Sequence, residues 1–215
     1  MDNLWILTEE RPKPSVIKTI LKTYCEDFNE RLDDSNEEIS IDPCIRGGAF
    51  SFLYEVVGVR VSGSDRIFIK TVSGSSSFLD FLLFKQEEEP NEKSDGNNLL
   101  MAIEETKTRD NESRNTGVYQ RGSKFVYIES YHRSVALYML YNEELEARKM
   151  KKPSGTNIFG TNMLLTLGVK VIGKDVNRWF KPFSSRFQAE VNLYHLRLGC
   201  EGHLKEMYQL ILLNI

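Results

Sequence analysis

From residue 50 to residue 108 the chain alternates runs of β-branched and aromatic residues with short stretches rich in Gly, Ser and acidic residues. The four runs are FSFLYEVVGVRV, RIFIKTV, SFLDFLLF and LLMAIEETKT. Runs of this kind between turn residues are typical of β-strands, and the SGSD after the first run favours a tight reversal. We therefore predict four strands in meander order over roughly 50–108.

Helices are expected on both sides of these strands. Pro14 and Ser15 open a segment whose apolar residues recur at three- and four-residue spacing, which predicts an amphipathic helix over 14–31; these residues are Ile17, Ile20, Leu21, Tyr24, Phe28 and Leu32. The acidic DDSNEE that follows indicates a solvated loop. Later segments predict two helices over 112–149, a surface connection at 151–157, a strand near 163–172 and a final helical run. The fold class is mixed α/β.

The size and charge of the chain suit one folded domain of 1–215. It has 215 residues, 40% of them hydrophobic, and a formal net charge of -3, so the total charge does not indicate a nucleic-acid partner. Acidic residues gather at 26–38 and 87–95, and many basic residues follow residue 108. Because charge is unevenly distributed, a net-acidic chain can still present a basic cleft.

The cysteines and the two ends of the chain bear on its cellular compartment and on possible contacts with a partner subunit. Cys25, Cys44 and Cys200 have no CxxC spacing, which favours neither a disulfide framework nor a zinc cluster and fits a reducing cytosol. The start has no signal-peptide pattern, and no window is apolar enough to span a membrane. The apolar ending YQLILLNI predicts that this helix packs against a partner subunit or that the chain continues beyond Ile215.

Asp80 interrupts an apolar run. In SSSFLDFLLF the apolar residues occupy both parities, so we expect a strand that is buried on both faces. An ionised carboxylate in such a strand is costly to desolvate unless a cation, a metal or several hydrogen-bond donors compensate it. Asp80 is therefore a candidate metal ligand, and the alternative is a structural carboxylate bonded to backbone amides or an Arg.

The next strand supplies a second carboxylate and a lysine. Met101, Ile103, Glu105 and Lys107 share one face by the two-residue period, whereas Glu104 falls on the other face with a structural role or a basic partner. An antiparallel hairpin would bring Asp80 and Glu105 close enough to hold one Mg²⁺, for which Mn²⁺ can substitute. Lys107 could then orient or deprotonate a water that attacks a substrate phosphate. The alternative for Glu-x-Lys at a strand end is a solvated edge.

An Asp in an apolar strand, followed after a loop by a strand that ends in Glu105-Thr106-Lys107, resembles the PD-(D/E)XK nuclease superfamily. The resemblance covers roughly 50–130 and implies a restriction-endonuclease-like core: a helix, an antiparallel meander, a helix and a further strand, here 14–31, 66–108, 115–131 and 163–172. Leu79 stands where the motif has proline. The serine-rich turn before Asp80 and SRNTGVYQRGSKF after Lys107 are most similar to type II restriction endonucleases.

The resemblance also implies further site residues. Gln120 would face the metal-bound water or the scissile phosphate. Basic and polar residues downstream are candidates for DNA contacts: Arg109, Arg114, Asn115, Arg121, Lys124, Lys170, Lys174, Arg178 and Lys181. For RWFKPFSSRF, two roles remain equally open: groove contact or base readout by Arg178, Trp179 and Lys181, and an aromatic anchor in the core.

The predicted function is magnesium-dependent hydrolysis of double-stranded DNA by a homodimeric, site-specific endonuclease. The core would cover about 14–172, and residues 132–215 would add recognition or dimerisation elements. Two alternatives stay open: a repair or recombination nuclease of the same fold, such as a mismatch nickase or junction resolvase, and a non-catalytic DNA-binding protein that retains the fold.

Overall fold

The structure is a computed structural model that describes residues 2–34, 38–46, 48–72, 79–91, 96–106, 124–125, 134–141, 155–173 and 180–185. Its main strands are β1 (Asn3–Thr8), β3 (Ser40–Arg46), β4 (Ala49–Val57), β6 (Ile67–Thr71), β7 (Phe81–Gln86), β8 (Leu99–Thr106), β9 (Ala136–Tyr141) and β10 (Lys170–Ile172). They form a mixed sheet in the order β10-β9-β8-β7-β1-β6-β4-β3. The helices are α1 (Pro14–Phe28) and α3 (Gly155–Thr166). The predicted mixed α/β class is confirmed.

Shorter elements complete this part of the chain. Strands β2 (Leu32–Asp33) and β5 (Arg60–Val61) pair with each other in a small second sheet, and a 3-10 turn, η2 (Gly96–Asn98), precedes β8. The chain divides into two compact units, Met1–Met101 and Ala102–Gln209, and the boundary falls within β8. The expectation of one nuclease domain over 1–215 stays a prediction.

Strand β1 lies at the centre of the first unit, and the sequence did not predict it. Its residues from Leu4 to Leu7 are almost completely buried, as expected for a strand covered on both faces. It pairs in parallel with β6 and antiparallel with β7, so β6 and β7 are not neighbours. The predicted meander is therefore wrong at this point, because an apolar segment from the N-terminus occupies the place between the two strands.

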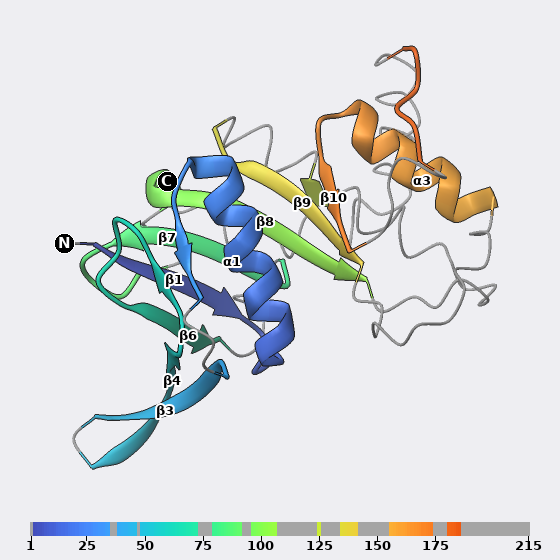
Figure 1. Cartoon of the computed structure of the whole chain (residues 1–215). Helices are drawn as coiled ribbons and strands as arrows, with labels where there is room; N and C mark the ends of the chain where they lie inside the picture. Colours follow the sequence, from blue (N-terminus) through green and yellow to red (C-terminus); the bar gives the residue numbers. More distant parts are fainter. Residues whose placement is uncertain are drawn as a thin grey trace. The chain divides into compact units, whose positions relative to one another are not determined.

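Helix α1 confirms the predicted amphipathic helix except at its end: it stops at Phe28, and Leu32, which was counted in the apolar stripe, lies in β2. Pro14 suits its first turn because a proline lacks the N–H that would be unsatisfied there. Val16, Ile17, Ile20, Leu21 and Tyr24 are buried along one side, and α1 lies across the strands of the first unit (Figure 1). The helix ends at Asn29, whose left-handed backbone (φ 54°) allows Glu30 N–H to bond to Cys25 O, with an N···O distance of 2.9 Å.

Strand β3 was also not predicted, and with β4 it forms a hairpin that extends from the sheet (Figure 1). The pairing register shifts between Pro43 and Ile45, and opposite this irregularity Phe52 adopts a left-handed backbone (φ 53°) with 61% of its surface exposed. A bulge of this kind redirects side chains out of the sheet. Acidic residues before this strand, and Asp42 and Pro43 within it, concealed its β pattern.

In the second unit, α3 connects two parallel strands. β9 and β10 pair in parallel, with Lys170 opposite Tyr138, and parallel neighbours require such a crossover. Three predictions are wrong here. Residues 136–141 are a strand rather than part of a helix, and 155–157 begin α3 rather than continue the surface connection. Residues 163–166 also belong to α3, which leaves only Lys170–Ile172 as strand. Short apolar runs such as VALYMLY do not distinguish a buried strand from a buried helix.

No helix within the described residues combines the length and the apolar character that crossing a membrane requires.

Candidate functional site

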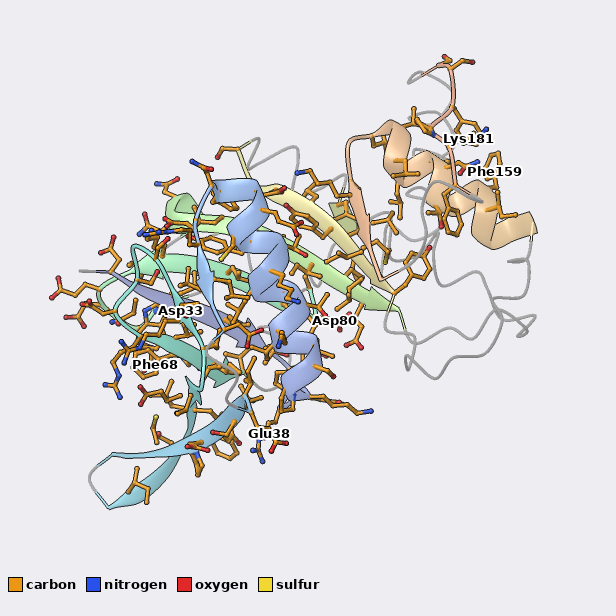
Figure 2. The ribbon with its side chains drawn as sticks, viewed as in Figure 1. Asp33, Glu38, Phe68, Asp80, Phe159 and Lys181 are labelled. Carbon is orange, nitrogen blue, oxygen red and sulfur yellow. The ribbon has the colours of Figure 1, made fainter. Side chains whose placement is uncertain are left out.

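Asp80 immediately precedes β7 in the first unit (Figure 2). Phe81, Leu82, Leu83 and Phe84 are all buried, so the expectation of a strand buried on both faces is confirmed. Asp80 itself lies one residue outside the strand and is partly exposed. Burial alone therefore does not demand a cation at Asp80, and its role as a metal ligand stays a prediction.

The register of the sheet defines the surroundings of Asp80. Thr8, the last residue of β1, pairs with Thr71 at the end of parallel β6 and with Phe81 at the start of β7. Asp80 therefore lies at the edge of the sheet where two parallel strands reach their carboxyl ends. In open α/β sheets this edge is where ligands commonly bind.

Glu105 is the penultimate residue of β8 in the second unit, and it is partly exposed. The strand before it is apolar, since Met101, Ala102 and Ile103 have no exposed surface. Glu104 is 2% exposed, so the two adjacent glutamates differ sharply in burial. Successive residues of a strand point to opposite faces, which agrees with the prediction that Glu104 and Glu105 have different roles.

Glu104 forms an ion pair with Lys124. The distance from Lys124 Nζ to Glu104 Oε1 is 2.7 Å, and Phe125 beside this lysine is buried. The prediction that Glu104 has a structural role or a basic partner is confirmed. Lys124 was predicted to contact DNA; the structure gives its ammonium a protein partner, and the DNA contact stays a prediction.

Two more predicted DNA-binding lysines belong to the second unit, and both are exposed. Lys170 begins β10, and its Nζ lies 5.7 Å from the centre of the Tyr138 ring, within cation–π range. Lys181 donates its backbone N–H to Asn162 Oδ1 of α3 at 2.8 Å (Figure 2). Their side chains are available to solvent, and their role in DNA binding stays a prediction.

The position of Phe180 decides between the two roles considered for part of the segment RWFKPFSSRF. It is 2% exposed and stacks on Tyr141 with ring centres 6.1 Å apart, while Phe183 contacts Phe159 of α3. Tyr141 also hydrogen-bonds to buried Thr161. This half of the segment is therefore an aromatic anchor against β9 and α3.

The remaining predicted site residues lie outside the described residues. They are Lys107, Arg109, Arg114, Asn115, Gln120, Arg121, Lys174 and Arg178. In the part of the chain that is described, no group of three or more His, Cys, Asp or Glu side chains could hold a metal ion. The predicted metal site uses two protein carboxylates, Asp80 and Glu105, and metal binding by this pair stays a prediction.

The sequence did not predict a polar network around Glu30 in the first unit. Lys85 Nζ lies 3.0 Å from Glu30 Oε1, and Ser62 Oγ donates to Glu30 Oε2 at 2.6 Å. The Ser62 and Lys85 hydrogen bonds lower the pKa of Glu30, and burial raises the pKa of Tyr24 beside Lys85. Burial also raises the pKa of the Cys25 thiol. The network holds the end of α1 against β7.

Searches against protein-family models, curated proteins and solved structures found no match to this chain.

Proposed function

We propose that the chain is a magnesium-dependent endonuclease that hydrolyses phosphodiester bonds in double-stranded DNA. Asp80 and Glu105 are the proposed metal ligands, and Lys107 is the proposed partner of the attacking water. The observation that carries the proposal is the position of Asp80, a partly exposed carboxylate at the carboxyl ends of parallel β1 and β6. A ligand bound at this edge of the sheet would lie beside the Asp80 carboxylate.

Glu105 supports the proposal independently. It is a partly exposed residue near the end of a strand in which Met101, Ala102 and Ile103 are completely buried. Rigid strands hold site residues more accurately than loops do. Asp80 and Glu105 are each attached to a well-packed strand.

Two carboxylates suit the proposed cation. Magnesium prefers oxygen ligands, keeps several waters and commonly takes only one or two carboxylates from the protein together with substrate phosphate. When bound, it would supply Lewis-acid stabilisation of the charge that develops at the phosphate. Asp80 and Glu105 would fix its position, and basic residues such as Lys170 and Lys181 would contact the DNA backbone.

Site-specific restriction, with the homodimer matching a symmetric site, is the first form of this proposal. A repair or recombination nuclease is the alternative within the same chemistry. The second candidate function is DNA binding without cleavage. One observation favours it: Glu104 is buried and paired with Lys124, so an acidic residue near the end of β8 has a structural use that needs no metal.

Digestion of supercoiled plasmid DNA with Mg²⁺ tests the proposal, with the fragment ends sequenced. We expect Asp80→Asn and Glu105→Gln each to reduce cleavage by more than about 100-fold, because loss of residues that merely support metal ligands already costs about 10–100-fold. Asp42→Asn, an exposed aspartate of β3, is the matched control and should cleave like the wild type.

The outcomes separate the candidates. Discrete ends indicate restriction, and scattered ends indicate a nonspecific or structure-selective nuclease. Wild-type protein that binds DNA but neither cleaves it nor binds Mg²⁺ in calorimetry would support the non-catalytic candidate and reject the nuclease.

A further inference from the structure

The ion pair between Glu104 and Lys124 lies next to the proposed metal ligand Glu105. Glu104 Oε1 accepts from Lys124 Nζ at 2.7 Å, and the exposed fraction of the side chain is 3% for Glu104 and 20% for Lys124. Both residues belong to the second unit, as does Glu105. The pair therefore joins the end of β8 to a segment 20 residues further along the chain.

A buried ion pair of this kind restricts the strand. A carboxylate that is almost fully removed from water must keep its cationic partner, because the free energy of an uncompensated buried charge is high. Glu104 therefore cannot rotate towards solvent without losing this partner. β8 ends at Thr106, and the ion pair fixes the strand two residues before that end, at Glu104.

The two-residue period of the strand links this restraint to Glu105. With Glu104 fixed on one face, the adjacent residue must project from the other face. Fraying or a one-residue slip at the strand end would exchange the two glutamates and bury the wrong one. A metal ligand gains affinity when surrounding contacts fix its orientation in advance.

We propose that Glu104 and Lys124 are positioning residues, whose buried ion pair directs the Glu105 carboxylate to the side of β8 that faces the metal. This inference rests on the proposed function, since it assigns the pair a role at the same site. Glu104 and Lys124 do not themselves contact the metal. Their contribution is to metal affinity, and it is separable from their contribution to stability.

The experiment measures Mn²⁺ binding without DNA, from the electron paramagnetic resonance signal of free Mn²⁺. The double variant Glu104→Met/Lys124→Met removes both charges of the pair, so the net charge is unchanged and neither charge is left without the other. We expect it to fold, with a Mn²⁺ affinity reduced by about 10–100-fold. Lys124→Arg keeps the cation and should bind Mn²⁺ nearly as tightly as the wild type.

The matched control is Glu55→Met/Arg66→Met, which removes a bidentate ion pair of the first unit and should leave Mn²⁺ affinity unchanged. Wild-type affinity in the folded Glu104→Met/Lys124→Met variant would overturn the positioning role and leave the metal site intact. A loss in Lys124→Arg as large as in the double variant would also overturn it. If the double variant does not fold, Glu104→Gln, which preserves the shape of the side chain, carries the same test.

Failure of the proposed function gives a different result. In that case the wild type itself does not bind Mn²⁺, and the positioning role is rejected together with the metal site.

Discussion

Each unit contains a glutamate–lysine ion pair, and the two pairs differ in their surroundings. In the first unit, Lys85 and Glu30 are 3.0 Å apart and expose 23% and 21% of their side chains. In the second unit, Lys124 and Glu104 are 2.7 Å apart, and Glu104 exposes only 3%. The distances are similar, so what separates the pairs is the access of the carboxylate to water.

Water access changes what each pair does. Glu30 also accepts a hydrogen bond from Ser62, and solvent can replace part of what Lys85 provides. Its network joins α1 to β7 and adds only modestly to the stability of the fold, as is usual for ion pairs that retain solvent contact. Glu104 depends far more on Lys124, because a buried charge without a partner is strongly destabilising. Similar contacts in two units therefore differ in the cost of breaking them.

The largest expected effect comes from breaking the buried pair. Lys124→Met should lower the free energy of unfolding by about 3–5 kcal/mol, because it removes the Lys124 ammonium from the buried Glu104 carboxylate. Lys85→Met, the matched change in the first unit, should cost about 1 kcal/mol or less. Urea denaturation measures both variants. Equal losses would show that the difference in burial has no energetic consequence.

A smaller effect is expected at Gly173 in the second unit, where β10 ends. Gly173 has φ +90°, and a Cβ there would lie 2.2 Å from the carbonyl oxygen of Tyr141. Gly168 has φ +86° with no neighbour within 4 Å of such a Cβ, so Gly168→Ala tests the backbone conformation alone.

Both alanine variants lose stability because alanine disfavours the left-handed conformation, and only Gly173→Ala also introduces a clash with the backbone. We expect Gly173→Ala to be less stable than Gly168→Ala by about 1–3 kcal/mol, the usual range for overpacking. Thermal unfolding followed by circular dichroism measures the difference. Coinciding midpoints would mean that β10 moves away from Tyr141 at no cost.

The smallest effect concerns pH. Because Ser62 and Lys85 lower the pKa of Glu30 in the folded protein, this carboxylate stabilises the fold above its unfolded pKa of about 4.3. The stabilisation is lost as the pH falls through the lower pKa of the folded state. The gap in unfolding free energy between wild type and Glu30→Gln should therefore shrink between about pH 6 and pH 3.

Urea denaturation at several pH values measures this gap, and Glu26→Gln, an exposed glutamate of α1, is the control. A gap that stays constant down to the acid end would contradict the role assigned to Ser62 and Lys85.

Local patterns were sufficient for several elements. The spacing of Ile17, Ile20, Leu21 and Tyr24 predicted α1, and the apolar runs predicted β4, β6, β7 and β8, because these periodicities are properties of neighbouring residues. The same reasoning separated Glu104 from Glu105 by the two-residue period. Short apolar runs such as LWIL and VALYMLY, which form β1 and β9, carried no comparable signal.

The sequence by itself determined which segments are apolar, which face of β8 each glutamate occupies, and which residues are candidates for a metal site. Only the tertiary structure decided that β1 separates β6 from β7, and that Asp80 lies outside its strand. It also selected Lys124 for Glu104 and Lys85 for Glu30, partners 20 and 55 residues apart. Strand neighbours and ion-pair partners that are distant in sequence depend on how whole elements pack. Local periodicity therefore does not predict which strands or which charged residues pair.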